Sequence, residues 1–435
     1  MAEIVGGVLY GLKNVAEGAA LIAKGIYDPT LPLKATIRPI TNVSVPLAHH
    51  SVSVIKGRAY LFGGKTTGEH GGTQLANSDV HVVILPTTCY GNVDYKKIRA
   101  TANAPPKRYG HSAAALDDQI YVFGGSGEDG TPLDEGGRVW VYSTSSNAWH
   151  TLDPPAHSPR PGPRTSHASV ASEHPRPAQK RPREDILPQR PPDPEETMPD
   201  IPGADTYGTL FIQGGQARSG NNLIDAWSFD LATRTWKELP DMPSPSSPSP
   251  SLSLVDRRLY AFSAGHTSFL DLDVPETGHV ELEPLKPWQT LPPTSSSPEK
   301  GDPGERAGAF VASLTTGQGR DYLLLVGGRS RSGAVLQDMW TLQLPSEDMS
   351  AASLKDAARV AMKMDTREAQ WEVVKYYNAD GVMIQEGQDG RGVGLREGFA
   401  AAKCVDLDGQ SVLLWGGIGA DHIPRGDGIM VTIEM

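Results

Sequence analysis

The fold is decided by the stretch Ile120-Tyr121-Val122-Phe123-Gly124-Gly125, which follows Arg108-Tyr109-Gly110-His111 and precedes Val139-Trp140-Val141-Tyr142 and Trp149. A strand that is apolar at every position must be covered on both faces. The two glycines lack a Cβ and allow positive φ where the chain leaves this strand. Tyr142 and Trp149 are large, flat side chains that fill the space between neighbouring sheets. These segments predict one four-stranded antiparallel sheet, the blade of a β-propeller.

The same unit recurs along the chain. Double glycines follow apolar strands at Gly63-Gly64, Gly124-Gly125, Gly214-Gly215, Gly327-Gly328 and Gly416-Gly417, and a sixth copy has Ala264-Gly265. This pattern resembles the kelch repeat, in which an apolar strand, a double glycine, an aromatic residue and a Trp follow one another. The pairs Tyr142 with Trp149 and Phe229 with Trp236 have the kelch spacing of six intervening residues. The six copies predict a propeller with six blades, and a lone propeller with an N-terminal helix resembles fungal-type single-domain kelch proteins.

The two ends of the repeat array complement each other. Residues 34–40 are predicted to form a strand before the first repeat, and the last repeat ends at residues 429–435 without a following Trp strand. The N-terminal strand can therefore be the outermost strand of the last blade and close the ring. We expect an all-β, six-bladed propeller over residues 34–435, with two insertions. Residues 174–202, rich in proline and charge, are expected to form a disordered loop, and residues 346–368 have the apolar spacing of a helix.

Residues 1–33 are expected to form an amphipathic helical extension. Their apolar residues recur at steps of three or four, at Ile4, Val8, Leu12, Val15, Ala19, Ile22 and Ile26. Two alternatives remain for this helix, packing on the outside of the propeller or docking, including formation of a homodimer. Charged residues interrupt each apolar run, so neither a signal peptide nor a membrane span is predicted.

Composition restricts the class of partner and compartment. The chain of 435 residues has 51 acidic and 40 basic residues, and its net charge of −11 argues against nucleic-acid binding. Two cysteines, Cys89 and Cys404, cannot form a disulfide framework, and we expect a reducing, cytoplasmic location. Residues 180–183, Lys-Arg-Pro-Arg, resemble a nuclear-import signal, with a solvated loop as the alternative.

Candidate binding residues come from one rim of the propeller. In a blade of four up-and-down strands, the connection into the first strand and the loop after the double glycine emerge at the same end. Arginine suits bidentate capture of carboxylate or phosphate, so these residues predict a protein or acidic-peptide partner, or an anionic small molecule. The predicted ligand-binding residues are Arg108, Tyr109, Arg164, Arg218, Arg306, Arg329, Arg331, Arg396, His422 and Arg425.

Structural alternatives stand beside this prediction. In kelch-like sequences the Arg and His of the connection, here Arg108 with His111 and Arg164 with His167, often brace backbone between blades. His81 takes the place of the Trp residues of other blades and is interpreted as a packed core histidine. Asp421-His422 and Glu69-His70 are a weak candidate for a metal or acid–base set, which chance explains better.

No catalytic residue, metal site or cofactor is predicted. The sequence has no Cys-x-x-Cys zinc pair, no G-x-S-x-G elbow and no phosphate-binding glycine loop. The copper site of galactose oxidase and the iron site of plant specifier proteins, both on kelch-like propellers, have no matching motif here. The resemblance favours a protein-interaction scaffold, and the alternative is a small-molecule-binding protein or an enzyme acting on an anionic metabolite at the mouth of the channel.

Overall fold

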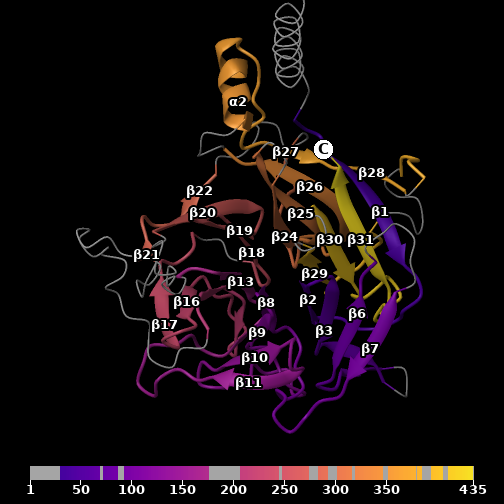
Figure 1. Cartoon of the computed structure of the whole chain (residues 1–435), viewed down its shortest axis with the longest axis vertical. Helices are drawn as coiled ribbons and strands as arrows, with labels where there is room; N and C mark the ends of the chain where they lie inside the picture. The colour runs from indigo at the N-terminus through magenta and orange to yellow at the C-terminus, as the bar shows by residue number, and fades with distance from the viewer. Residues whose placement is uncertain are drawn as a thin grey trace, which may run out of the picture.

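Six sheets of four or five strands surround a central axis in the computed structural model (Figure 1). The structure describes residues 30–68, 72–86, 93–175, 206–243, 247–273, 283–291, 301–315, 319–345, 351–378, 380–384, 393–404 and 410–434. The innermost strands of the six sheets contact one another in a closed cycle. The predicted six-bladed propeller is therefore confirmed.

Blades one to three are regular sheets whose strands run in chain order from the axis outward. Blade one consists of β2 (Ser51–Ile55), β3 (Arg58–Phe62), β6 (Val80–Ile84) and β7 (Asp94–Ile98). Blade two consists of β8 (Ser112–Leu116), β9 (Gln119–Phe123), β10 (Val139–Ser143) and β11 (Ala148–Leu152). Blade three consists of β13 (Ala168–Ser172), β14 (Thr209–Gln213), β16 (Ala226–Asp230) and β17 (Thr235–Leu239). Two short pairs lie beside them: β4 (Lys65–Thr67) with β5 (Thr73–Leu75), and β12 (Arg164–Thr165) with β15 (Gln216–Ala217).

Blades four to six carry additional strands. Blade four consists of β18 (Ser251–Val255), β19 (Arg258–Ser263), β20 (His266–Asp273), β21 (Glu283–Pro284) and β22 (Gln289–Thr290). Blade five consists of β23 (Arg306–Ala307), β24 (Phe310–Thr315), β25 (Asp321–Ser330), β26 (Val335–Gln343) and β27 (Trp371–Val373). Blade six consists of β29 (Ala400–Lys403), β30 (Ser411–Trp415), β31 (Gly428–Glu434), β1 (Lys34–Ile40) and β28 (Lys375–Tyr377). The helix α2 (Ala351–Ala361) lies between β26 and β27, inside the insertion for which helical spacing was noted.

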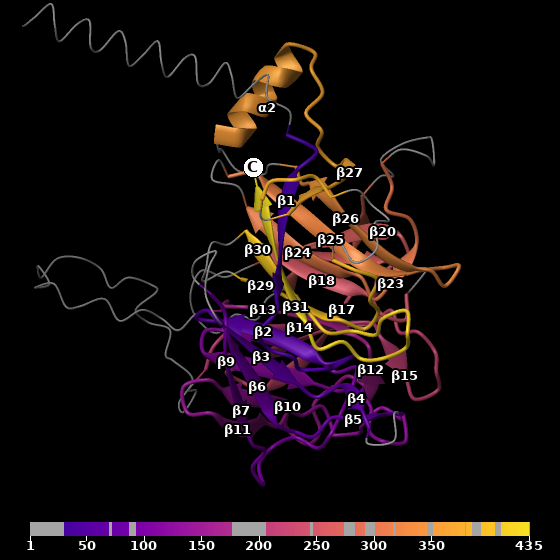
Figure 2. The ribbon, with the colours of Figure 1, turned by 90° about the vertical axis from the view of Figure 1, so that its right-hand side faces the viewer.

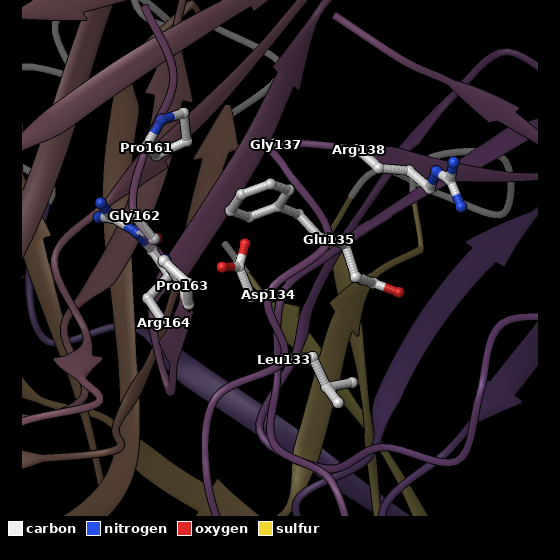
Figure 3. A pocket seen from close by; sticks show the side chains of 11 residues that line it. Leu133, Asp134, Glu135, Gly137, Arg138, Pro161, Gly162, Pro163 and Arg164 are labelled. Carbon is white, nitrogen blue, oxygen red and sulfur yellow. Dashed lines mark hydrogen bonds between the residues drawn. The ribbon is translucent and has the colours of Figure 1, made fainter. Parts of the chain in front are cut away.

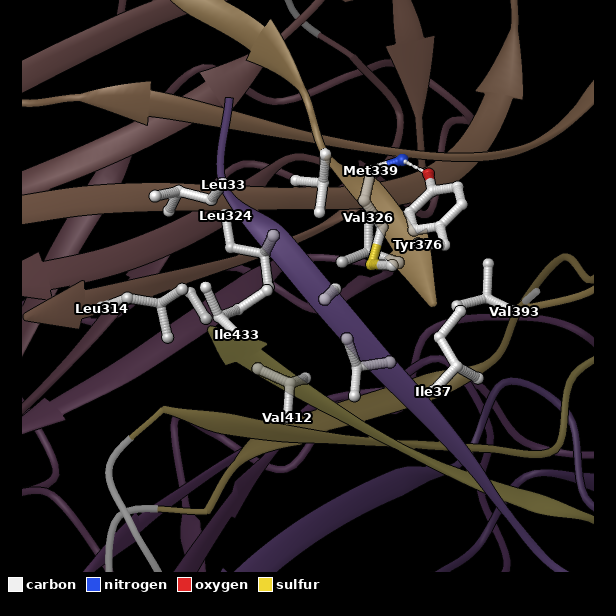
Figure 4. Close-up of a cluster of buried hydrophobic side chains, with 14 of the residues drawn as sticks. Leu33, Ile37, Leu314, Leu324, Val326, Met339, Tyr376, Val393, Val412 and Ile433 are labelled. Carbon is white, nitrogen blue, oxygen red and sulfur yellow. Dashed lines mark hydrogen bonds between the residues drawn. The ribbon is translucent and has the colours of Figure 1, made fainter. Parts of the chain in front are cut away.

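The ring is closed by β1, as the sequence predicts. This strand pairs antiparallel with β31 along its whole length, from Lys34 opposite Glu434 to Ile40 opposite Gly428. Figure 4 shows β1 crossing the buried cluster between blades five and six, to which Ile37, Val412 and Ile433 belong. The structure adds β28, which pairs parallel with β1 and was not predicted.

The double glycines have the predicted backbone conformation and also leave space for the next blade. Gly124 and Gly125 have φ of 60° and 94°. A Cβ on Gly124 would lie 2.7 Å from the carbonyl oxygen of Arg164 and 2.9 Å from the ring of His167, both from blade three. Ala264 takes the same left-handed conformation with φ of 48°, although it carries a Cβ.

Aromatic side chains fill the space between blades as predicted. Tyr142 and Trp149 of blade two are 1% and 7% exposed and pack against Tyr60 and Phe62 of blade one. The ring centroids of Tyr142 and Trp149 are 5.0 Å apart. Burial of each such side chain contributes about 1.5 to 3 kcal/mol, so these contacts are a main source of cohesion between blades.

Three expectations fall on residues outside the described part of the chain. These are the N-terminal amphipathic helix up to residue 29, most of the 174–202 insertion with its Lys180–Arg183 cluster, and the Glu69-His70 pair. Within the described residues, no helix has the length and apolarity needed to cross a membrane.

Candidate ligand-binding face

The predicted rim residues belong to one end of the propeller, which we call the diglycine face. It carries the double glycines at the ends of the second strands, the connections into the first strands and the loops before the third strands. Figure 2 shows the short strands β4, β5, β12, β15 and β23 along this end. The predicted residues divide into a buried set and an exposed set, and Tyr109 is half-buried.

Arg108 belongs to the buried set and acts as a clamp within blade two. Its side chain is fully buried, and Nη1 donates a 2.9 Å hydrogen bond to the carbonyl oxygen of Gly124. Its guanidinium also donates two hydrogen bonds, each 2.8 Å, to the carboxylate of Glu135. Trp140 Nε1 donates to the same carboxylate at 2.9 Å. The clamp thus ties the connection, the second strand and the third strand of one blade together.

The same clamp recurs in three other blades. Each arginine donates to the first glycine carbonyl of its own blade and pairs with a carboxylate before the third strand: Arg164 with Asp225, Arg306 with Asp338, and Arg396 with Asp427. All four arginines are 4% exposed or less. The prediction that they bind a ligand on the rim is therefore wrong in its placement, because their donors point into the blade. The bracing alternative matches their contacts.

The carboxylates of the clamp were missed by the sequence analysis. Asp225 and Asp338 each lie two residues before a Trp that donates to them, Trp227 and Trp340. The recurrence of Asp-x-Trp after a double glycine, together with Arg-x-x-His in the connection, is the signal that could have identified the pairs.

Neighbouring blades are linked through the same connections. Gly64 N–H donates to the carbonyl oxygen of Arg108 at 2.8 Å, and Gly125 N–H donates to that of Arg164 at 2.9 Å. The ring of His111 is 2.8 Å from the hydroxyl of Ser51, and that of His167 is 2.8 Å from Ser112. Burial lowers the pKa of both histidines well below the ordinary value, so both rings are neutral at pH 7.

A ring of backbone hydrogen bonds borders the channel mouth on this face. His49 N–H donates to Gly398, Gly110 N–H to His49, and Ser166 N–H to Gly110, at 2.6, 2.9 and 2.6 Å. In five of the connections, one residue has a positive φ in the left-handed backbone region: His49, Gly110, Ser166, Gly308 and Gly398. The mouth is therefore framed by interlocked backbone, and the charged side chains lie outside it on a rigid base.

Tyr109 is half-buried and stands beside two basic side chains. Lys65 Nζ lies 3.8 Å from the centre of the Tyr109 ring, a cation–π contact. The ring of His49 meets Tyr109 edge to face at 6.3 Å. Burial, with a smaller effect from the charge of Lys65, lowers the pKa of His49, so Lys65 is the positive charge of this cluster at pH 7.

Arg329 and Arg331 project from blade five. They lie at the tip of the β25–β26 hairpin, where β25 continues beyond its double glycine. Arg329 Nη1 is 2.5 Å from Glu397 and its side chain is 53% exposed, whereas Arg331 is 3.4 Å from Glu305 and 85% exposed. Each guanidinium thus has one carboxylate partner at the surface and free area for another ligand.

The remaining predicted residues, Arg218, His422 and Arg425, are also exposed. Hydrogen bonds from Thr131 lower the pKa of Asp129, and the positive charge of Arg218 has a smaller effect in the same direction. Arg218 therefore lies close to the loop of blade two that carries Asp129. Arg425 lies along the backbone of Gly419, where a Cβ would be 2.5 Å from its Nε. The exposed set is therefore spread over blades three, five and six and is interleaved with acidic residues.

The central channel, of about 460 Å³, is lined by the first strands of all six blades. Its wall is mostly Ala, Val, Leu and Ser, and Asp117 and Lys403 are its charged residues within the described chain. Lys403 lies at the end of β29 away from the diglycine face, and burial lowers its pKa while the nearby Asp321 opposes that effect. The described residues contain no group of three or more His, Cys, Asp or Glu side chains arranged to hold a metal ion.

A second, much smaller crevice lies between blades two and three (Figure 3). Pro161, Pro163 and Arg164 line one side of it, and Leu133, Asp134 and Glu135 line the other. Its volume of about 10 Å³ is no larger than one water molecule needs. This crevice is therefore a packing defect beside the clamp and not a ligand site.

Blade one departs from the clamp pattern. Leu47 stands where other blades have the clamp arginine, and Asp79 pairs with Lys97 at 2.8 Å.

His81 of blade one is half-buried and not enclosed in the core: its Nδ1 is 2.7 Å from the hydroxyl of Tyr95, and the centres of the two stacked rings are 6.0 Å apart. The interpretation of His81 as a packed core histidine is thus corrected to an outer-strand contact.

Six blades around a channel, with double glycines and arginine clamps repeated from blade to blade, define a kelch-type β-propeller. The chain is a kelch-repeat protein. Residues 33–175 match the family model KLHDC2/KLHL20/DRC7 Kelch-repeats domain, and residues 206–243 match the Kelch motif.

Curated relatives cover parts of the chain. The mouse Kelch domain-containing protein 1 is 30% identical over 125 residues, which are 28% of this chain and 27% of that protein. The F-box/kelch-repeat protein At1g51550 of Arabidopsis thaliana is 23% identical over 74% of this chain and 60% of its own length. The chain therefore matches less than two thirds of the length of these relatives.

The fold matches a solved structure titled "Structure of YjhT". The TM-score is 0.50 with 15% identity, and the match covers 91% of this chain and 99% of that chain. At this identity the likeness shows the fold alone.

Proposed function

We propose that this kelch propeller is a protein-binding scaffold whose diglycine face takes an acidic peptide. The observation that carries the proposal is the difference between the two sets of arginines. The clamp arginines are buried and donate to carbonyl and carboxylate groups inside the blades, whereas Arg329 and Arg331 are 53% and 85% exposed on a projecting hairpin.

The exposed ion pairs can exchange partners at small cost. An ion pair at the surface contributes about 0 to 1 kcal/mol, because water competes for both charges. A carboxylate of a partner can therefore replace Glu397 or Glu305 beside these arginines and gain the bidentate geometry that a guanidinium offers. Lys65 on the Tyr109 ring adds a positive charge and an aromatic surface at the neighbouring edge of the channel mouth.

The experiment begins with selection of a displayed random-peptide library on the wild-type propeller. The affinity of the enriched peptides is then measured for a variant with four loop arginines changed to alanine: Arg218→Ala, Arg329→Ala, Arg331→Ala and Arg425→Ala. We expect enrichment of Asp and Glu and a loss of affinity of about tenfold or more, about 1.4 kcal/mol.

A matched control removes four exposed arginines from elsewhere: Arg58→Ala, Arg234→Ala, Arg257→Ala and Arg367→Ala. It has the same change in net charge and should keep the affinity. Enrichment of peptides without acidic residues, or an equal loss in the control, would contradict the proposal.

A second candidate is an anionic small molecule in the central channel. Lys403 favours it, because this half-buried amine lines a channel of about 460 Å³. The Lys403→Met variant separates the two candidates, because it removes the only lysine of the described channel wall and leaves the diglycine face unchanged. Loss of a co-purifying anion in this variant, with peptide binding unchanged, would favour the second candidate.

A further inference from the structure

The helix α2 is anchored by its charged side. Asp356 and Arg359 are each 4% exposed, and Arg320, from the end of the loop before β25, is 5% exposed. Arg320 pairs with Asp356 at 2.8 Å, and Arg359 Nη1 donates to the same carboxylate at 2.6 Å. Breaking one member of a buried ion group leaves an uncompensated charge, so this contact fixes the orientation of the helix.

The apolar side of α2 consequently faces outward. Leu354 and Val360 are each 65% exposed, and Met362, just after the helix, is 44% exposed. Figures 1 and 2 both show α2 standing outside the ring of blades, beyond the end of blade five. An apolar helix face in this position is typical of a docking surface.

The described chain begins next to the anchor of this helix. The carbonyl oxygen of Thr30 accepts a 3.2 Å hydrogen bond from the hydroxyl of Tyr322. Burial raises the pKa of Tyr322 to about 12, and the charges of Arg320, Asp356 and Arg359 also act on this hydroxyl. Thr30 therefore lies beside the base of α2, and 29 residues precede it in the sequence.

The sequence of those residues fits an apolar surface. Their apolar residues recur at helical spacing from Ile4 to Ile26, and in a helical projection Lys13, Glu17 and Lys24 fall on the opposite side. In a helix, the 23 residues from 4 to 26 would be about 34 Å long at 1.5 Å per residue. The 11-residue helix α2 is shorter than that, so the segment can cover its whole length.

We propose that residues 4–26 of this chain dock on the exposed apolar side of α2, which is centred on Leu354, Ala357 and Ala361 and has Val360 and Met362 at its two flanks. The occupant belongs to the same chain, because Thr30 is tethered beside the anchor and the effective concentration of the segment is high. This interface lies on blade five, away from the diglycine face, and is independent of the peptide site.

The test places the photo-crosslinking amino acid p-benzoylphenylalanine at Leu354 in the full chain. Irradiation followed by peptide mapping should give crosslinks to residues 4–26 within a monomer. The same probe at Leu285, which is 60% exposed in blade four, is the control and should give none to this segment.

Two double variants test the predicted contact face of the segment. Val8→Asp with Leu12→Asp places charge on the apolar side and should reduce crosslinking from position 354 to the level of the Leu285 control. Tyr10→Asp with Asn14→Asp has the same charge change and spacing on the other side and should leave it unchanged. Crosslinks to a second copy, crosslinks to another segment, or none at all would each overturn the proposal.

Discussion

Replacement of Arg164 by methionine tests the role of the arginine clamp. The side chain is 1% exposed and donates to Asp225 at 2.8 and 2.6 Å, and also to the carbonyl oxygens of Gly214 and Gly162. Methionine keeps most of the apolar stem and removes all of these donors. The change therefore removes the arginine donor from one carboxylate and two carbonyl groups of blade three, and among the described residues Asp225 keeps only Trp227 as a side-chain donor.

The expected cost is large because the pair is buried. Removing one partner of a buried ion pair costs about 3 to 5 kcal/mol. The Asp225 side chain is 22% exposed and can hydrate in part, so the lower value of about 3 kcal/mol is expected here. An unfolding entropy of about 2.1 cal/mol/K per residue converts this loss to a decrease of about 4 °C in Tm for a domain of this size.

Thermal and denaturant unfolding measure the effect, with Arg329→Met as the matched control. Arg329 also pairs with a carboxylate but is 53% exposed, so its loss should cost at most about 1 kcal/mol. Equal stability of the two variants would refute the assignment of Arg164 as a clamp.

The pH dependence of stability provides a second readout for Arg164. Burial raises the pKa of Asp225, but hydrogen bonds and charge from Arg164 outweigh it and hold the pKa below 3.8. The wild-type protein should therefore keep this stabilisation above about pH 4 and lose it as the pH falls through the lowered pKa. The variant should lack this loss.

Three further predictions concern the glycines and the buried histidines. Gly124→Ala should destabilise the protein by about 2 to 3 kcal/mol, because φ is 60° and the new Cβ would meet the next blade, and thermal unfolding measures it. Ala264→Gly should instead stabilise by about 0.5 kcal/mol in the same assay, because a left-handed residue loses its Cβ. Burial lowers the pKa values of the three histidines His50, His111 and His167, to about 3 for His50. As the pH decreases from 6.5, only the unfolded chain takes up these protons, so the free energy of unfolding should decrease by about 1.4 kcal/mol per pH unit for each histidine. A free energy of unfolding that stays constant between about pH 7.5 and 5.5 in urea titrations would contradict this.

The architecture could be predicted because its determinants are local and repeated. Double glycines such as Gly124-Gly125 and pairs such as Tyr142 with Trp149 lie within one blade, and each copy supports the interpretation of the others. The closing strand β1 followed from a missing last strand. By contrast, β28 is held by pairing with β1, more than 300 residues earlier in the chain, and carries no local signal.

The candidate site could be predicted only in part, because a loop position does not fix the direction of a side chain. Arg108 and Arg329 both belong to the diglycine face, but Arg108 turns inward to Glu135, 27 residues later, and Arg329 stays at the surface. The orientation of α2 was likewise hidden, because it depends on a pair between Arg320 and Asp356.

A charge-swap cycle between Arg331 and the selected acidic peptide tests the central claim most directly. The Arg331→Glu variant should bind the acidic peptide more weakly and recover affinity for a peptide with Lys in place of its contacting acidic residue, with a coupling energy of at least about 1 kcal/mol. Independent effects of the two changes, with no recovery in the double swap, would contradict binding of the peptide at the diglycine face.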